Sequence, residues 1–358
     1  MDKVLSKFGT IDERIFSVAN GCRPGTISEP TGWSAERDDD PETIVSPIFL
    51  VGSVRSGTTL LRLMLDHHPE LAFHHESQYM VEKLPETGWP DLGAFYEGLV
   101  HDRIFQDSRF TIDRRLNYRQ LMNSFLAQKR DRDGKRLVGS TVHLHFDRLL
   151  RIWPDARFIH IVRDGRDVAR SRVELGWAGN MYTGVDSWIE AERLWEKFRD
   201  QVAPDRRIDI RYEDLISDAP GELSRICDFL DLPYDPAMLR YNQNSTYQPP
   251  DLSLINQWRR KLSPTAVRLA ESRIADMLVD RGYELSGHKR LKNGPIFDRL
   301  MRLDDRRNRL KMRRRAYGNR LFLAELASRT LEPLRRKLTD FRINVRERIN
   351  EVERASLK

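Results

Sequence analysis

Residues 44–68, IVSPIFLVGSVRSGTTLLRLMLDHH, contain the pattern that decides the fold. The run from Ile44 to Val51 is apolar and leads directly into Gly52, which predicts a buried strand of a parallel sheet. After the turn, apolar residues recur at the spacing of a helix, namely Leu60, Leu61, Met64 and Leu65. A strand that passes through a glycine-containing turn into a helix is typical of an α/β fold.

Strand-like and helix-like segments alternate along the chain beyond this unit. Residues 156–162 (ARFIHIV) and 206–212 (RRIDIRY) have the composition of strands, and residues 92–130 read as mostly helical. Helical patterns are also found at 167–175, 185–202, 222–232 and 264–285. This alternation predicts an α/β fold with a mainly parallel sheet flanked by helices.

The charge of the 358-residue chain is unevenly distributed. The formal net charge is +7, yet residues 286–358 contain 22 Lys+Arg and 9 Asp+Glu and so carry +13. The preceding 285 residues must therefore carry −6. Together with the loop chemistry of residues 1–43, this shift predicts three parts: an N-terminal extension at 1–43, a domain at 44–285, and a basic helical C-terminal extension at 286–358.

Composition excludes several classes of protein. Hydrophobic residues make up 39% of the chain and aromatic residues 9%, which is enough to build a core. No apolar run approaches the roughly 18 residues of a membrane-spanning helix. The first 16 residues lack the apolar centre of a signal peptide, and Cys22 and Cys227 cannot form a disulfide scaffold or a four-cysteine zinc site. We therefore expect a cytoplasmic protein.

The turn between strand and helix, Gly52-Ser53-Val54-Arg55-Ser56-Gly57-Thr58-Thr59, is suited to a phosphate. Two glycines five positions apart allow backbone N–H groups to point inward, and the helix N-terminus adds partial positive charge. The spacing matches the phosphate loop of nucleoside triphosphatases, which predicts a P-loop-NTPase-like sheet. In that motif a lysine reaches the terminal phosphates, whereas Thr58 stands there in this chain and Arg55 supplies the cation from within the loop.

A second polar segment, Arg163-Asp164-Gly165-Arg166-Asp167-Val168-Ala169-Arg170-Ser171, follows the strand at 156–162. It lies where a strand ends and a helix begins, the edge at which α/β proteins bind ligands. By itself the segment is more typical of a surface salt-bridge network among Arg163, Asp164, Arg166 and Asp167 than of a ligand site. A ligand site needs Arg163 and Ser171, eight positions apart, to approach the same group.

Taken together, the two segments resemble the sulfotransferase family that uses 3′-phosphoadenosine-5′-phosphosulfate (PAPS). The likeness is greatest to its tyrosylprotein and bacterial branch, whose Pro-Arg-Ser-Gly-Thr-Thr appears here as residues 54–59 with Val54 in place of Pro. Residues 153–167 and Tyr212-Glu213-Asp214-Leu215 extend the likeness, which covers about 44–285. The resemblance implies an enzyme that moves a sulfuryl group from PAPS to a hydroxyl of a carbohydrate, lipid or other small molecule, without a metal.

The resemblance also implies roles for individual residues. The 5′-phosphosulfate would be bound by Arg55, Ser56, Gly57, Thr58 and Thr59. The 3′-phosphate would be bound by Arg163 and Ser171, and Tyr212 matches a tyrosine near the adenine or the 3′-phosphate.

The acceptor hydroxyl requires a proton acceptor. In the tyrosylprotein branch this is a Glu 21 positions after the loop arginine, which is Glu76 here. Other branches use a His at this place, so His75 and His74 are the alternatives. Arg55 would stabilise the charge that develops as the bond to the donor breaks.

The chain departs from the tyrosylprotein branch at one catalytic position. A family lysine that would stabilise the transferring group falls near 138–140, Val-Gly-Ser, where no lysine is present. Either Arg55 acts alone or a nearby cation or imidazole substitutes, and the candidates along the chain are Lys135, Arg136, His143 and His145.

The basic C-terminal extension allows several interpretations. Apolar residues and arginines alternate between 296 and 322, which is typical of an amphipathic helix at the inner surface of a membrane, or of an extension packed on the enzyme or on a second copy of it. No nucleic-acid-binding motif accompanies the charge. Two other functions stay open: a P-loop kinase, disfavoured by Thr58, and a non-catalytic nucleotide- or lipid-binding protein, disfavoured by Glu76.

Overall fold

The computed structural model describes residues 43–245, 247–330, 345 and 348–349. Except for Thr43, the predicted N-terminal extension at 1–43 lies outside the described residues, and Cys22 lies within it. Most of the chain beyond Thr330 also lies outside them. The described chain forms two compact units. One consists of Ile44–Glu174 and Ala178–Asn308; the other includes Leu175–Trp177 and the helical residues from Arg309 onward. The three-part division of the chain stays a prediction.

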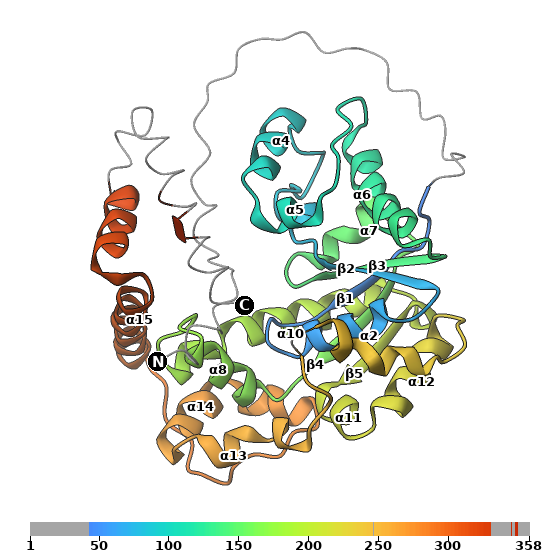
Figure 1. The fold of residues 1–358 in the computed structure, drawn as a ribbon. Coiled ribbons are helices and arrows are strands. Elements are labelled where there is room, and N and C mark those ends of the chain that lie inside the picture. The colour runs from blue at the N-terminus through green and yellow to red at the C-terminus, as the bar shows by residue number, and fades with distance from the viewer. Residues whose placement is uncertain (1–42, 246, 331–344, 346–347, 350–358) are drawn as a thin grey trace. The chain divides into compact units, whose positions relative to one another are not determined.

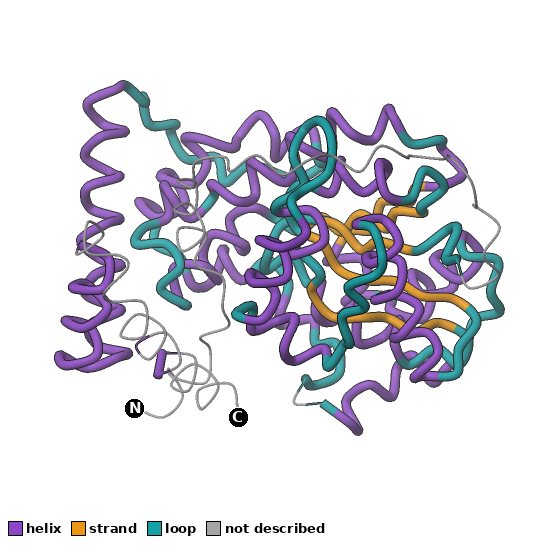
Figure 2. Tube along the Cα trace, turned by 90° about the horizontal axis from the view of Figure 1, so that it is seen from above, coloured by secondary structure: helices purple, strands orange, loops and turns teal. Residues whose placement is uncertain are grey.

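A five-stranded parallel sheet forms the centre of the larger unit (Figure 1). The strands are β1 (Ile48–Val51), β2 (Leu71–Glu76), β3 (Leu137–Val142), β4 (Arg157–Val162) and β5 (Arg207–Arg211), in the order β2-β3-β1-β4-β5. The predicted parallel α/β fold is therefore confirmed. Strands β1, β4 and β5 lie within the three segments of the sequence that we predict to be strands. Strands β2 and β3 were not predicted. In Figure 2 the strands lie side by side among the helices.

Helices connect the strands and cover the sheet. The longer ones are α2 (Thr58–Asp66), α4 (Leu92–Val100), α6 (Tyr118–Asp133), α8 (Gly165–Glu174), α10 (Asp186–Phe198), α12 (Ala219–Phe229), α14 (Pro264–Asp280) and α15 (Pro295–Thr330). The shorter ones are α3 (Tyr79–Glu82), α5 (Arg103–Ser108), α7 (Leu149–Ile152), α9 (Met181–Gly184), α11 (Tyr212–Ser217) and α13 (Gln257–Lys261). The 3₁₀ segment η4 (Pro236–Asn244) follows α12.

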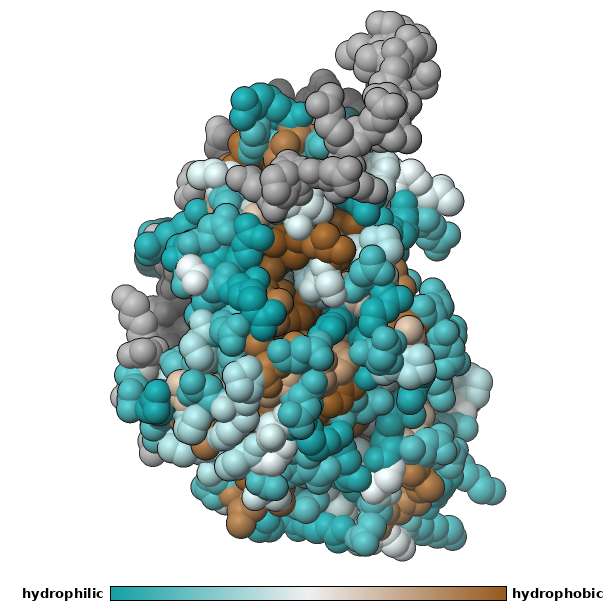
Figure 3. Space-filling model, turned by 90° about the vertical axis from the view of Figure 1, so that its right-hand side faces the viewer, coloured by the Kyte–Doolittle hydropathy of each residue, from teal (hydrophilic) through white to brown (hydrophobic). Residues whose placement is uncertain are grey.

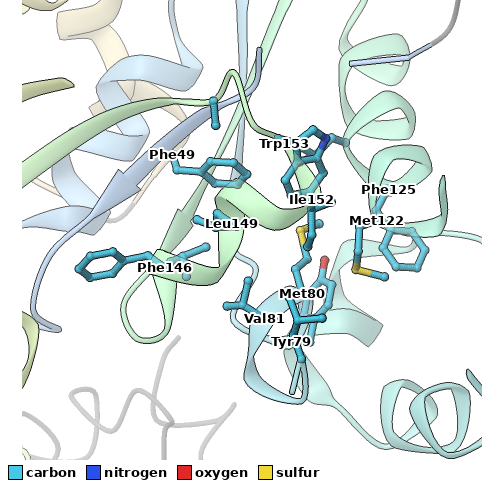
Figure 4. Close-up of a cluster of buried hydrophobic side chains, with 14 of the residues drawn as sticks. Phe49, Tyr79, Met80, Val81, Met122, Phe125, Phe146, Leu149, Ile152 and Trp153 are labelled. Carbon is cyan, nitrogen blue, oxygen red and sulfur yellow. The ribbon is translucent and has the colours of Figure 1, made fainter. Parts of the chain in front are cut away.

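Successive residues of β1 face opposite sides of the sheet, as a strand requires. Phe49 packs with Trp153 and with helices α3 to α7 in one apolar cluster, part of which Figure 4 shows. Leu50 packs on the other side with α2, α11 and α12. Because both sides are covered, β1 is apolar throughout and its carboxyl end opens onto the loop at residues 52–57.

Helix α8 and its neighbours form a third cluster beyond β4. Val168 and Ala169 of α8 pack there with Trp188 of α10 and Ile274 of α14. Trp188 also donates from Nε1 to the carbonyl oxygen of Arg163 at 2.9 Å. This packing fixes the turn that joins β4 to α8.

On the face shown in Figure 3, hydrophobic residues gather in the middle and hydrophilic residues surround them.

Candidate functional site

The phosphate loop follows β1. Neighbouring atoms come so close to its two glycines that neither position has room for a side chain. Gly52 has φ +146°, and a Cβ atom there would lie 2.3 Å from the carbonyl oxygen of Ile161. Gly57 has φ +95°, and a Cβ atom there would lie 2.2 Å from the ring of Tyr212. Side chains at either position would therefore push the loop away from β4 and from Tyr212.

The end of the loop presents donors that suit an anion. Gly57 is the N-cap of α2 and no side chain caps this helix, so the first amides point outward from its positive end. The hydroxyl of Ser56 is buried and has no hydrogen-bond partner among the residues that the structure describes. A buried hydroxyl without a partner is costly in a folded protein, and a phosphate oxygen would satisfy it. Thr58 is buried in the first turn, while Thr59 is half-buried beside it.

The two polar segments meet at Arg55. Its Nε donates to the hydroxyl oxygen of Ser171 at 3.0 Å, across 116 positions of sequence. Arg163 donates from Nη1 to the carbonyl oxygen of Arg55 at 3.3 Å. Arg55 itself has φ +71°, a conformation that side chains rarely adopt outside functional turns. The structure thus brings together the arginine of one motif and both ends of the other.

Arg163 is a buried cation whose described contacts are to a ring and to carbonyl oxygens. Its guanidinium lies over the ring of Tyr212, 4.2 Å from the centroid, and donates from Nη2 to the carbonyl oxygen of Leu254 at 3.0 Å. Its Nε has no partner, and it forms no ion pair with a residue that the structure describes. A buried guanidinium without a carboxylate is suited to a phosphate.

Other charged residues of the second segment form a salt-bridge network, which is the alternative interpretation of its sequence. Arg166 is fully buried and pairs with Asp164 at 2.7 Å and with Glu271 at 2.6 Å. Arg170 pairs with Glu174 at 2.5 Å on the next turn of α8. The segment therefore divides: Arg163 and Ser171 face the phosphate loop, while Arg166 and Arg170 make ion pairs.

Glu76 is the last residue of β2, and His143 follows β3 next to it. His143 Nε2 lies 3.5 Å from Oε1 of Glu76, and its Nδ1 lies 2.9 Å from the carbonyl oxygen of Gly52. The contact to a carbonyl oxygen places a proton on Nδ1. His143 thereby connects the carboxylate to the start of the phosphate loop.

Burial and this partner act in opposite directions on Glu76. Burial raises the pKa of the Glu76 carboxyl, but hydrogen bonding and charge from His143 outweigh it, so the pKa lies below its usual value. For His143 burial lowers the pKa, whereas Glu76 raises it above its usual value. Both shifts favour the pair of carboxylate and imidazolium.

The two alternative bases are placed differently. His74 is buried in β2 against Phe110, and burial brings the pKa of its imidazole well below the usual value. The His75 ring stacks on that of His74 at 3.9 Å between centroids, and its Nδ1 lies 3.3 Å from the carbonyl oxygen of Glu76. Burial lowers the pKa of His75 as well. Both imidazoles are thus neutral near pH 7.

The structure shows why no lysine occupies 138–140. Gly139 faces Phe73, and a Cβ atom there would lie 2.3 Å from its ring. Ser140 is buried and its hydroxyl lies 2.5 Å from that of Ser77. Of the four candidate substitutes, only His143 has a described contact with Glu76. The sequence alone does not distinguish His143 from the other three candidates, because its contact with Glu76 depends on β2 and β3 being neighbours in the sheet.

The other three candidates have different partners. Lys135 donates to the carbonyl oxygens of Asp66 and Leu71, and Arg136 pairs with Glu70 at the opposite end of β2. His145 has a left-handed backbone conformation. Within the described ranges, no cluster of three His, Cys, Asp or Glu side chains has the arrangement of a metal site.

The chain is similar to known sulfotransferases. A model described as the sulfotransferase family matches residues 47–236. The protein-tyrosine sulfotransferase of Drosophila melanogaster is 26% identical over 288 residues, which cover 69% of this chain and 54% of that protein. The omega-hydroxy-beta-dihydromenaquinone-9 sulfotransferase Stf3 of Mycobacterium bovis is 26% identical over 253 residues, covering 53% and 64%. The chain thus spans less than two thirds of either relative.

A solved structure supports the fold. The sulfotransferase domain from the curacin biosynthetic pathway superimposes with a TM-score of 0.50 at 21% identity, covering 68% of this chain and 99% of that domain. The family model includes the phosphate loop, Glu76, His143, Arg163, Ser171 and Tyr212, and it spans more than half of the sequence. The chain therefore belongs to the sulfotransferase family.

Proposed function

We propose that the protein transfers a sulfuryl group from PAPS to a hydroxyl acceptor. The observation that carries this proposal is the meeting of Arg55, Arg163 and Ser171, which come from two motifs far apart in the sequence. Three donors around one loop match a ligand that carries two separate anionic groups better than one that carries a single phosphate chain.

The residues present fit PAPS. The 5′-phosphosulfate would be held by Arg55, Ser56 and the first amides of α2, where the buried Ser56 hydroxyl has no partner in the described part of the chain. Arg163 and Ser171 would hold the 3′-phosphate, with Tyr212 supporting the Arg163 guanidinium. PAPS supplies an activated sulfuryl group on a good leaving group.

Catalysis then requires a base and a charge-stabilising group. Glu76 accepts the proton of the acceptor hydroxyl while the oxygen of the acceptor forms the new bond to sulfur. The bond from sulfur to the bridging oxygen of the donor breaks, and Arg55 stabilises the negative charge on that oxygen. His143 keeps Glu76 ionised and oriented, so it is a positioning residue.

The acceptor is a hydroxyl, as in the relatives. The names of the two relatives specify a protein tyrosine and a hydroxylated menaquinone. The two named acceptors differ in everything but the hydroxyl, so a carbohydrate, a lipid or another small molecule is the acceptor class that we propose here. Cys227 is a buried free thiol, which accords with the cytoplasmic setting that we propose.

Ligand-induced thermal stabilisation tests this proposal. Adenosine-3′,5′-bisphosphate should raise the melting temperature in a concentration-dependent way, whereas ATP with Mg²⁺ should not, because Thr58 replaces the lysine that a triphosphate needs. Ser171→Ala should weaken the bisphosphate affinity about tenfold, as expected for a hydrogen bond to a charged group. Ser272→Ala, at a half-buried serine of α14, is the matched control. Stabilisation by ATP with Mg²⁺ alone would instead support a kinase.

The pH profile tests the positioning role of His143. In the wild type, activity should fall as the pH decreases through the lowered pKa of Glu76, because only the carboxylate is a base. His143→Asn removes the group that lowers this pKa while burial still raises it, so the acidic limb of kcat/KM should move to higher pH. The rate at alkaline pH should largely recover. His145→Asn is the control, and an acidic limb unchanged in His143→Asn contradicts the role.

A further inference from the structure

The first part of α15, residues 295–308, belongs to the larger unit and makes hydrogen bonds to the residues around α9. The hydroxyl of Thr183 donates to Oδ1 of Asp305 at 2.6 Å, and Nδ2 of Asn180 donates to Oδ2 of Asp304 at 2.9 Å. Asp298 accepts from the hydroxyl of Tyr182 at 3.3 Å. All three carboxylates of this stretch are therefore used in the contact with α9 and the residues around it.

The opposite face exposes large apolar side chains. Ile296 is 79% exposed, Leu300 54% and Leu303 56%. Their spacing of four and three residues places them on the same side of the helix. Three exposed branched side chains in consecutive turns form a stripe, which differs from single exposed leucines scattered over a surface.

Unpaired arginines border this stripe. Arg299, Arg306 and Arg307 are exposed, and none of them has an ion-pair partner among the residues that the structure describes. Residues 309–315, RLKMRRR, continue the same composition along the chain. The stripe of Ile296, Leu300 and Leu303 and the three arginines that border it thus contain no carboxylate, and the partly exposed Asp298 is paired with Arg302.

We propose that this face binds the surface of an anionic lipid bilayer. Apolar side chains enter the boundary between headgroups and acyl chains, and arginines contact the lipid phosphates. A second copy of this face would place arginine against arginine, and a nucleic acid would leave the apolar stripe in water. Asp304 and Asp305 make hydrogen bonds to Asn180 and Thr183, and the partly exposed Asp298 is paired with Arg302 at 2.9 Å. This arrangement suits such a surface, because an unpaired carboxylate beside anionic headgroups would be repelled.

The binding is peripheral. Among the described helices, none has an apolar stretch long enough to cross a bilayer. The inference concerns this face alone and stands independently of the proposed sulfuryl transfer. It provides a way to bring the enzyme to acceptors held in or near a membrane.

Co-sedimentation of the full-length protein with vesicles tests the proposal. The wild type should bind vesicles of phosphatidylcholine with about 30 mol% phosphatidylglycerol and not vesicles of phosphatidylcholine alone, and added salt should weaken the binding. Leu300→Ser/Leu303→Ser should weaken it about tenfold or more through lost apolar burial. Arg306→Gln/Arg307→Gln should weaken it about 20-fold.

Matched controls keep the test specific. Val100→Ser/Val279→Ser changes two apolar side chains of similar exposure, 53% and 55%, and should leave binding unchanged. Arg193→Gln/Arg240→Gln removes two exposed arginines elsewhere and should have at most a small effect. If the leucine variant does not fold, as judged by its melting temperature, the arginine variant still decides the result.

Several outcomes would overturn the proposal. Equal binding to neutral vesicles, no binding to anionic vesicles, or unchanged binding in both α15 variants each excludes an anionic membrane as the partner. A change from dimer to monomer in Leu300→Ser/Leu303→Ser, with vesicle binding unaffected, assigns the face to a second copy. Binding to a DNA duplex that the leucine changes leave intact assigns it to nucleic acid.

Discussion

Replacing Glu76 by glutamine should lower kcat for sulfuryl transfer by about 10²–10⁴-fold, the usual contribution of a general base. Glutamine keeps the size of the side chain and can accept a hydrogen bond from His143, but it cannot take the acceptor proton. The melting temperature and the affinity for adenosine-3′,5′-bisphosphate should change far less than kcat, since glutamine fills the same space beside His143. Single-turnover measurements with PAPS and a reactive hydroxyl acceptor would show the effect on the chemical step.

The control for this substitution lies on the same strand. Glu70 pairs with Arg136 near the amino end of β2, so Glu70→Gln should retain activity. His75→Gln and His74→Gln examine the alternatives. If His75→Gln causes the large loss and Glu76→Gln is nearly normal, the base is His75 and the role of Glu76 is wrong.

Replacing Arg55 by alanine should reduce kcat by about 10²–10³-fold, the effect of removing one preorganised charge-stabilising group. Burial lowers the pKa of Arg55, but a guanidinium stays charged at any working pH, and its poor solvation strengthens its attraction for a developing negative charge. Alanine retains the Cβ atom at φ +71°, so the strain of the loop backbone is the same in both proteins.

A charge-conserving variant separates charge from geometry. Arg55→Lys should recover part of kcat, but it loses the planar group that donates to Ser171. Bisphosphate affinity should fall moderately in both variants, whereas Arg240→Ala, at an exposed arginine, should behave as the wild type. A kcat near normal in Arg55→Ala would remove Arg55 from the mechanism.

Part of the fold was predictable because its signals are local. The strands β1 and β4 are marked by apolar runs, β5 by isoleucines that alternate with charged residues, and the phosphate loop by glycines between a strand and a helix. Strand β2 was missed because LAFHHE carries two histidines and a glutamate, which are typical of exposed segments. His74 is nevertheless buried, since Phe110 packs on its ring from a distant part of the chain. Strand β3, LVGSTV, has Gly139, Ser140 and Thr141 in its middle, which weakens its pattern.

The sequence by itself determined the phosphate loop, the parallel α/β class and the membership in a family of sulfotransferases, because each depends on residues that are neighbours in the chain. The contact of Arg55 with Ser171, the contact of His143 with Glu76 and the ion pairs of Arg166 are visible only in the folded chain. The same holds for Arg163, which has no carboxylate partner among the described residues. Those contacts depend on which strands lie next to each other. Parallel strands are joined by long crossovers, so their neighbours are set by packing of the whole sheet rather than by local sequence.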